Sequence, residues 1–347
     1  MFLRISHLAR RQYLDTITDG VSIVFSIKND AVDRLARAVA VASRSFSRNP
    51  TLRQELIHRY PLARFNESAD VLAGDALVRF LRGHTKAITG HEVLNDPVFR
   101  AVPELRLISK YGVGLDTIDL ESARTHGVAV RWTPGVNRQA VAELAVAFMI
   151  ALCRRIVPAA LMVRDGTWRQ TGGRQLSTAT VGILGCGAVG QTVARLCAAF
   201  GSTVLAHDVR VYDEFYRSSG VKPVSLDVLL RESDIVTVHL PLDASTRGLI
   251  GAGAISLMKP SAFLINTSRG GIVDELALRI ALVEHKLGGA AADVFAVEPP
   301  ADSELLRQPN FIGTPHIGGS TEEAVLAMGR AAIGGLDESP ESVNLTA

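Results

Sequence analysis

The stretch from Thr180 to Asp208 constrains the fold more than any other part of this 347-residue chain. An apolar run, Val181–Leu184, leads into the sequence Gly185-Cys186-Gly187-Ala188-Val189-Gly190, and an alanine-rich helical pattern follows. A strand, a glycine turn and a helix therefore follow one another. This order is typical of the first turn of a doubly wound parallel sheet.

The glycines of this turn are expected to have separate roles. Gly185 permits a tight turn, Gly187 permits the backbone to approach a pyrophosphate, and Gly190 permits close packing of helix on strand. The free N–H groups at the start of the helix, at Ala188 and Val189, would hold the phosphates. The turn therefore predicts a dinucleotide-binding (Rossmann) domain.

An acidic residue refines this prediction. A second apolar run, Thr203–His207, ends at Asp208, where a carboxylate can accept a hydrogen bond from a ribose 2′-hydroxyl. The acid favours NAD over NADP, and Arg210 is the nearby cation, which we expect to point to solvent. A glycine motif alone occurs by chance in loops, but this one has the expected strand, helix and acid around it.

Length, charge and cysteine usage set outer bounds. The length suggests two domains, and the net charge of +2 points neither to nucleic acid nor to an anionic membrane. The three cysteines have neither metal-site spacing nor a disulfide framework, so no metal is expected and a reducing cytoplasm suits them. No apolar run reaches the roughly 18 residues of a membrane span. Residues 1–20 are interpreted as a loosely held extension.

The chain from residue 21 to 133 is predicted to form a small flavodoxin-like domain. Apolar runs alternate there with helical patterns, which is typical of a parallel sheet covered on both faces. The expected strands are Val21–Ser26, Ala63–Asn66, Ala76–Leu81, Arg106–Tyr111 and Ala129–Trp132. Ligands gather at the carboxyl ends of such strands. The candidate substrate-binding residues are therefore Arg82, His84, Lys110, Tyr111 and Gly112.

The second domain is predicted over residues 134–316. A long apolar stretch, Gln139–Ile156, is expected to form a buried helix that bridges the domains. Further strands are expected at Ile235–Leu240, Ala262–Asn266, Gly289–Val294 and Phe311–Thr314, about six in all, with helices near Leu226–Leu230 and Val273–Glu284. The helical pattern Glu322–Ile333 is expected to return the chain to the first domain, which then includes residues 317–336, and residues 337–347 form a polar tail.

Three charged or titratable residues follow strands of the second domain. The planar guanidinium of Arg269 can bind the carboxylate of a 2-keto acid and polarise its carbonyl. His316 can give a proton to the carbonyl oxygen while hydride arrives from a nicotinamide, and Glu298 can hydrogen-bond the imidazole and favour its charged form. Each has a plainer interpretation when taken alone: a surface ion pair for Arg269, a structural histidine for His316 and a solvated loop acid for Glu298.

Taken together, these motifs resemble those of the D-isomer-specific 2-hydroxyacid dehydrogenases, especially the D-3-phosphoglycerate dehydrogenase branch. The matching segments, in chain order, are Tyr111–Asp116, Ala142–Ala145, Gly185–Gly190, His239–Leu242, Asn266–Asp274, Asp293–Pro299 and Pro315–Gly319. The resemblance implies that Arg269 binds substrate, that His316 is the acid and base with Glu298 as its partner, and that Asp293 lies near the nicotinamide carboxamide. It further implies NAD contacts at His239, Pro241, Thr267, Arg269, His316 and Gly318, and a homodimer built through the NAD-binding domain.

We therefore expect an NAD-dependent enzyme that interconverts a small anionic D-2-hydroxy acid and its 2-keto acid. Arg82, His84 and Lys110 are expected to converge, which favours a phosphate- or phosphonate-bearing substrate; alternatively, Lys110 and Arg82 pair with surface acids such as Glu92 or Asp116. Lys110, Tyr111 and Gly83 also depart from the phosphoglycerate pattern, which makes a hydroxypyruvate or glyoxylate reductase the alternative enzyme.

The alternative from another class is an NAD(H)-sensing protein without enzymatic activity, like the corepressor branch of the family. No regulatory domain is expected after Leu336.

Overall fold

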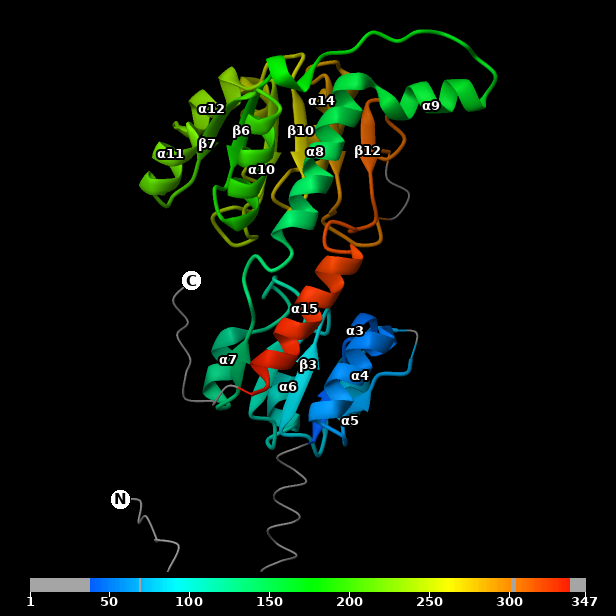
Figure 1. Cartoon of the computed structure of the whole chain (residues 1–347), viewed down its shortest axis with the longest axis vertical. Coiled ribbons are helices and arrows are strands. Elements are labelled where there is room, and N and C mark those ends of the chain that lie inside the picture. The colour runs from blue at the N-terminus through cyan, green and yellow to red at the C-terminus, as the bar shows by residue number, and fades with distance from the viewer. Residues whose placement is uncertain (1–37, 69, 301–303, 338–347) are drawn as a thin grey trace, which may run out of the picture. The chain divides into compact units, whose positions relative to one another are not determined.

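The computed structural model describes residues 38–68, 70–300 and 304–337, so the expected extension, the expected strand Val21–Ser26 and the tail beyond Asp337 lie outside the described residues. The chain divides into two α/β units, Met1–Trp132 with Gly329–Ala347, and Thr133–Met328 (Figure 1). Each unit is built on a parallel sheet, which confirms the predicted fold class. The chain returns to the first unit between Met328 and Gly329, within the helix α15 (Glu322–Gly335). The predicted boundary lay between residues 316 and 317.

The first unit contains a five-stranded sheet in the order β2-β1-β3-β4-β5. Its order reverses between β1 and β3, and ligands bind at such switch points outside the carboxyl ends of the strands. The elements, in chain order, are β1 (Val39–Val41), α3 (Arg44–Arg48), α4 (Pro50–Arg59), β2 (Arg64–Phe65), α5 (Gly74–Leu81), β3 (Lys86–Thr89), α6 (Asp96–Ala101), β4 (Leu107–Lys110), α7 (Leu120–Thr125) and β5 (Ala129–Arg131).

The predicted strand Ala76–Leu81 is wrong, because these residues belong to the helix α5. Leu77, Phe80 and Leu81 are buried, and their i, i+3, i+4 spacing places them on one helical face. The strand lies instead at β3, and β1 was not predicted. As a result, the loop of Arg82 and His84 precedes β3 instead of following a strand.

The second unit contains a seven-stranded parallel sheet in the order β12-β11-β10-β9-β6-β7-β8, whose switch point lies between β6 and β9. The expected strands and helices are present with slightly different bounds, and the edge strand β8 (Lys222–Pro223) is additional. The elements, in chain order, are α8 (Arg138–Arg154), α9 (Ile156–Arg164), a 3-10 turn (Leu176–Thr178), β6 (Thr180–Leu184), α10 (Ala188–Ala199), β7 (Thr203–His207), α11 (Asp213–Ser219), β8, α12 (Leu226–Glu232), β9 (Ile235–Val238), α13 (Ala252–Leu257), β10 (Phe263–Asn266), α14 (Glu275–Val283), β11 (Gly289–Ala292) and β12 (Phe311–Gly313).

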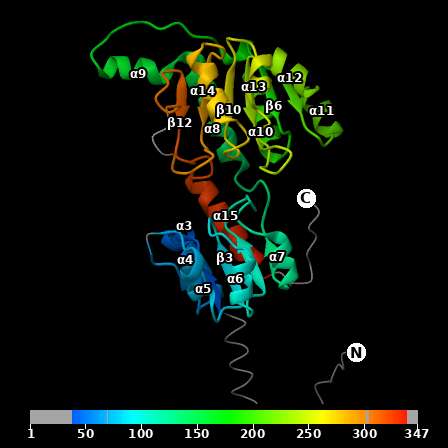
Figure 2. The same ribbon diagram turned by 180° about the vertical axis from the view of Figure 1, so that it is seen from behind.

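Two apolar cores cover the two faces of this sheet. Helices α8 and α10 supply the core of one face, and α12, α13 and α14 supply that of the other (Figures 1 and 2). The predicted helix Gln139–Ile156 ends at Arg154, because Arg155 adopts a left-handed conformation with φ of 52°. Helix α8 packs on α10 and the sheet within the second unit.

Helix α9 follows at once and buries none of its residues. It exposes Ile156, Leu161 and Val163, and Trp168 beyond it is 89% exposed. No single helix in the described ranges has the length and hydropathy of a membrane span, and α8 and α9 do so only when taken together across a 63° bend.

The three cysteines, Cys153, Cys186 and Cys197, are free, buried and all in the second unit. Burial raises the pKa of the Cys186 thiol to about 11 and that of Cys197 to about 12. The part of the chain that the structure describes holds no cluster of three or more side chains suited to a metal ion.

Candidate active site

The glycine turn lies at the switch point of the second sheet. Gly185 has a φ of 94°, and a Cβ there would lie 2.8 Å from the backbone of His239 at the end of β9. A Cβ at Gly190 would lie 2.0 Å from the carbonyl oxygen of Gly185, so the helix can pack on the turn only without a side chain. At Gly187, by contrast, no described atom lies within 4 Å of such a Cβ. The turn is thus closed on the protein side and open at Gly187, where α10 begins with Ala188 and Val189.

Asp208 follows β7 and is held by the backbone. Its Oδ2 accepts from the Cys186 N–H at 2.6 Å, and its Oδ1 accepts from the Arg210 N–H at 2.8 Å. The carboxylate is therefore fixed beside the glycine turn, and the side chain of Arg210 is exposed.

Two polar atoms at neighbouring strand ends are enclosed and have no hydrogen-bond partner among the described residues: His239 Nδ1 and Thr267 Oγ1. The other ring nitrogen of His239 lies 3.0 Å from Thr237 Oγ1, and burial lowers the pKa of the imidazole to about 3. His239 is thus neutral near pH 7. Pro241 is exposed beyond it, and its carbonyl accepts from Thr246 Oγ1 at 2.7 Å.

The Arg269 loop follows β10 and is shaped by the last residue of that strand. Asn266 Nδ2 donates to the Arg269 carbonyl at 2.9 Å, while Asn266 Oδ1 accepts from the N–H and the hydroxyl of Ser268. A Cβ at Gly270 would lie 1.9 Å from the carbonyl oxygen of Phe295, so only glycine fits where the loop turns back. These contacts fix the backbone from which the half-buried Arg269 projects.

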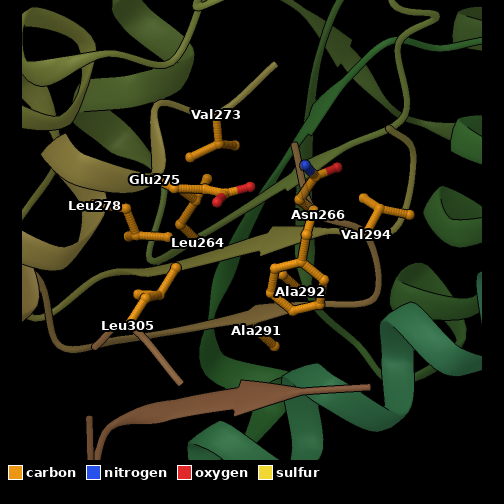
Figure 3. Close-up of a pocket in the computed structure, with 10 residues that line it drawn as sticks. Leu264, Asn266, Val273, Glu275, Leu278, Ala291, Ala292, Val294 and Leu305 are labelled. Atoms are coloured by element: carbon orange, nitrogen blue, oxygen red, sulfur yellow. The ribbon is translucent and has the colours of Figure 1, made fainter. Parts of the chain in front are cut away.

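A small apolar hollow lies among the strands and the helix α14 behind this loop. Figure 3 shows Leu264, Val273, Leu278 and Leu305 around it, with Asn266 and Glu275 as the polar side chains. The Glu275 carboxylate accepts from the Ala296 N–H at 2.6 Å. We interpret the hollow as a packing feature, since its polar groups serve the backbone.

His316 and Glu298 are in contact. His316 Nδ1 lies 2.7 Å from Glu298 Oε2, and Glu298 Oε1 accepts from the Phe295 N–H at 3.0 Å. The carboxylate is thereby oriented by its own loop. Strands β10, β11 and β12 are neighbours in the sheet, so the segments of Arg269, Glu298 and His316 leave the same edge.

Asp293 holds the loop that carries His316. It is 1% exposed, its Oδ1 accepts from Thr314 Oγ1 and from the Ile317 N–H at 2.8 Å, and its Oδ2 accepts from the Gly318 N–H at 2.7 Å. His316 has a φ of 54°, rare for a residue with a side chain, and its N–H donates to the Asp293 carbonyl at 2.9 Å. The sequence did not indicate this supporting role, because the partners, one hydroxyl and two backbone N–H groups, lie 21 to 25 residues away.

In the first unit, Lys110 ends β4 at the carboxyl edge of the sheet and is 5% exposed. Its ammonium donates to the Gly90 carbonyl and to Thr117 Oγ1 at 2.7 Å. Tyr111 is buried edge-on against Phe46, with ring centroids 5.7 Å apart, and Gly112 follows with a φ of 125°. The ammonium of Lys110 thus serves the protein's own backbone.

Arg82 and His84 do not join Lys110. Their loop precedes β3, so it lies at the amino-terminal edge of the parallel sheet. The Gly83 N–H in this loop donates to Glu104 Oε1 at 2.5 Å. The expected convergence of Arg82, His84 and Lys110 is therefore wrong.

The turn that does follow β3 is Gly90-His91-Glu92, which the sequence analysis did not select. Glu92 is 1% exposed and is not the surface acid that we considered. Its Oε2 accepts from the Gly90 N–H at 2.6 Å. The missed signal is the position of the turn, which is recognisable only once β3 is correctly placed.

Comparisons with known proteins identify the family of this chain. The family model described as "D-isomer specific 2-hydroxyacid dehydrogenase, NAD binding domain" matches residues 146–318. The chain is 43% identical over 235 residues to D-3-phosphoglycerate dehydrogenase of Archaeoglobus fulgidus, an alignment that covers 67% of this chain and 45% of that protein. It is 39% identical over 237 residues to hydroxypyruvate reductase of Thermotoga maritima, with 67% of this chain and 76% of that protein covered.

A solved structure of a glyoxylate reductase from Paecilomyes thermophila has the same fold, with a TM-score of 0.79 and 27% identity over 88% of this chain and 95% of that chain. The chain spans about half the length of the D-3-phosphoglycerate dehydrogenases that it matches, at 45% and 46%.

Proposed function

Since the chain belongs to the D-isomer specific 2-hydroxyacid dehydrogenases, we propose that it is an NAD-dependent oxidoreductase that interconverts a small D-2-hydroxy acid and its 2-keto acid. The observation that carries the proposal is the contact of 2.7 Å between His316 and Glu298, on the sheet edge that also carries Arg269. In this proposal, the second unit is the NAD-binding domain and the first unit contributes to substrate binding.

The residues at the switch point of the second sheet fit a dinucleotide. The open position at Gly187 leaves room for a pyrophosphate against the N–H groups of Ala188 and Val189. Asp208 stands where it can accept from a ribose hydroxyl. His239 Nδ1 and Thr267 Oγ1, at the neighbouring strand ends, have no hydrogen-bond partner among the described residues. When bound, NADH supplies the hydride for carbonyl reduction.

The chain's own residues would supply binding, charge and a proton. The Arg269 guanidinium holds the substrate carboxylate in a bidentate pair and draws electron density from the carbonyl. His316 is oriented through Nδ1 by Glu298, so its Nε2 is the nitrogen that hands a proton to the carbonyl oxygen. In the opposite direction the same nitrogen takes the hydroxyl proton. Glu298 stabilises the positive charge that the imidazole carries before reduction.

The three cations expected to bind a second anionic group of the substrate do not converge in the first unit. Arg82 and His84 lie on the other edge of the sheet, and Lys110 is engaged with Gly90 and Thr117. A phosphate would require cations that face it, because a buried anion without partners is costly. We therefore place glyoxylate and hydroxypyruvate ahead of phosphate- or phosphonate-bearing keto acids.

We also propose that the protein forms a homodimer through the second unit. Helix α9 buries none of its own residues and exposes Ile156, Leu161 and Val163, an apolar surface that a second copy could cover. The buried helix α8 is less suitable as an interface, since nine of its residues already pack within the unit. We also propose that the protein is located in a reducing cytoplasm.

The direct test follows NADH absorbance with glyoxylate, hydroxypyruvate, 3-phosphohydroxypyruvate and 3-phosphonopyruvate. We expect turnover with the first two, and a loss of about 100-fold or more in kcat for His316→Asn with the Kd for NADH largely kept. A lead of about tenfold or more for the phosphorylated compound would reverse the substrate order. Tight NADH binding without turnover of any compound would indicate a nucleotide-sensing protein instead.

A further inference from the structure

Building on the proposed function, we propose that Glu92 and Lys110 are positioning residues that hold the Gly90–His91 turn in the shape required for substrate binding. The turn follows β3 at the point where the strand order of the first sheet reverses. Such switch points are where open parallel sheets bind their ligands. Neither residue needs to contact the substrate in this role.

The two side chains bind the two backbone polar groups of Gly90. Glu92 Oε2 accepts from the Gly90 N–H at 2.6 Å, and the ammonium of Lys110 donates to the Gly90 carbonyl. Backbone pairing ends one residue earlier, where the Thr89 carbonyl accepts from the Tyr111 N–H at 2.8 Å. The two side chains therefore restrain the backbone one residue beyond the point where the hydrogen bonds between β3 and β4 end.

The charges of the pair balance in a place that excludes water. Glu92 is 1% exposed and Lys110 is 5% exposed. Burial raises the pKa of Glu92, while the positive charges of Lys110 and Arg44 favour its ionised form. Buried charges without a structural or functional use are rare, because each one costs free energy. A fixed turn is a use that accounts for both.

The turn also has little room to move. A Cβ at Gly90 would lie 2.8 Å from Ser43 Oγ, so the glycine is packed against the residue that caps α3. The end of β4 and the segments after β1 and β3 thus meet around Gly90. A shift of this residue would displace the exposed His91 at the carboxyl edge of the sheet.

The first sheet offers a matched control at its other edge. There Glu104 Oε1 accepts from the Gly83 N–H at 2.5 Å, just as Glu92 accepts from that of Gly90. Both glutamates follow β3 in sequence and each receives one glycine N–H, but only Glu92 serves the carboxyl edge. Glu104→Gln therefore controls for the loss of a carboxylate that holds a loop.

The experiment compares wild type with Glu92→Gln, Lys110→Met, the double variant and Glu104→Gln. Glutamine has nearly the same size and shape as glutamate, so Glu92→Gln is expected to fold. Steady-state kinetics with glyoxylate and hydroxypyruvate give kcat and KM, and fluorescence titration gives the Kd for NADH. Amide hydrogen exchange of the peptide around Gly90 reports the turn without relying on activity.

We expect KM for the keto acid to rise about tenfold or more in each single variant, with kcat and the Kd for NADH within about threefold of wild type. In the double variant, KM should rise by less than the product of the two single increases, because neither buried charge is then left unpaired. Exchange at Gly90 should accelerate in all three, and Glu104→Gln should match wild type in every measurement.

An unchanged KM or unchanged exchange in Glu92→Gln would overturn the inference while the proposed function stands. So would an equal rise in KM for Glu104→Gln, or a parallel loss of kcat and NADH binding that indicates general damage. If none of the tested keto acids supports NADH oxidation by the wild type, the proposed function is overturned, and this inference with it.

Discussion

Replacing Asp293 by asparagine tests how the loop that carries His316 is held. Asparagine can keep the acceptor that faces Thr314 and Ile317, but its amide group would then point an N–H at the Gly318 N–H, where Oδ2 accepts at 2.7 Å in the native protein. The change removes a charge-assisted hydrogen bond and leaves buried donors unpaired, at a cost of about 1.5–3 kcal/mol. His316 lies on this loop and has a φ of 54°, so its backbone depends on that support.

If this loss displaces His316 and raises the activation free energy by the same amount, kcat should fall about 10- to 150-fold, at 1.4 kcal/mol for each factor of ten. Steady-state kcat with a saturating keto acid measures this, and NADH titration measures cofactor binding separately. Asp274→Asn is the control, because Asp274 accepts from the N–H groups of Leu276 and Ala277 at 3.0 Å, at the start of α14. A kcat for Asp293→Asn within about threefold of wild type would refute the reasoning. A matching loss of NADH affinity would instead favour a direct contact between Asp293 and the nicotinamide carboxamide.

Three shorter predictions concern other parts of the second unit. Burial lowers the pKa of His239 to about 3, whereas a histidine in the unfolded chain titrates near pH 6.5; the stability from this group is therefore complete above pH 6.5 and is lost as the pH falls, by up to about 2 kcal/mol at pH 5. His239→Asn should flatten that dependence in urea unfolding between pH 7 and 5, and an unaltered slope would contradict the burial argument. Asp208→Ala should raise kcat/KM for NADP relative to NAD by about tenfold or more, because the carboxylate repels a 2′-phosphate; equal use of both cofactors by wild type would contradict the assignment. Leu161→Glu, on the exposed face of α9, should convert a dimer to a monomer in analytical ultracentrifugation, and a monomeric wild type would remove the basis for the interface.

The second unit could be predicted closely because its elements have distinct local signals. Buried parallel strands such as Ile235–Val238 are short apolar runs, and the glycine turn has steric requirements that other residues do not meet. His316, Glu298 and Arg269 were selected as candidates through their positions after such strands. The supporting role of Asp293 was beyond the sequence, because it depends on which backbone N–H groups a distant loop presents.

The first unit was predicted less well because of one ambiguous run. Residues 76–81 form a short and mostly apolar run. The composition of such a run is compatible with a strand and with a buried helix. The spacing of Leu77, Phe80 and Leu81 favoured the helix. Because of this error, the strand was predicted to end at Leu81 instead of Thr89. The loop of Arg82 was therefore assigned to the carboxyl edge of the sheet, although it lies at the amino-terminal edge. The error brought Arg82 into the expected site and left out Glu92, whose burial no local pattern indicates.

The distribution of the three cysteines makes this protein a reporter of its own partial unfolding. All three thiols belong to the second unit, and all are enclosed. Disulfide reagents react with the exposed thiolate, so labelling requires that this unit open. The first unit, which has no cysteine anywhere in its sequence, stays silent in such an assay. The rate of thiol modification in native buffer would therefore measure the opening free energy of the nucleotide-binding half alone, and its slowing on addition of NADH would give the cofactor's affinity without any turnover.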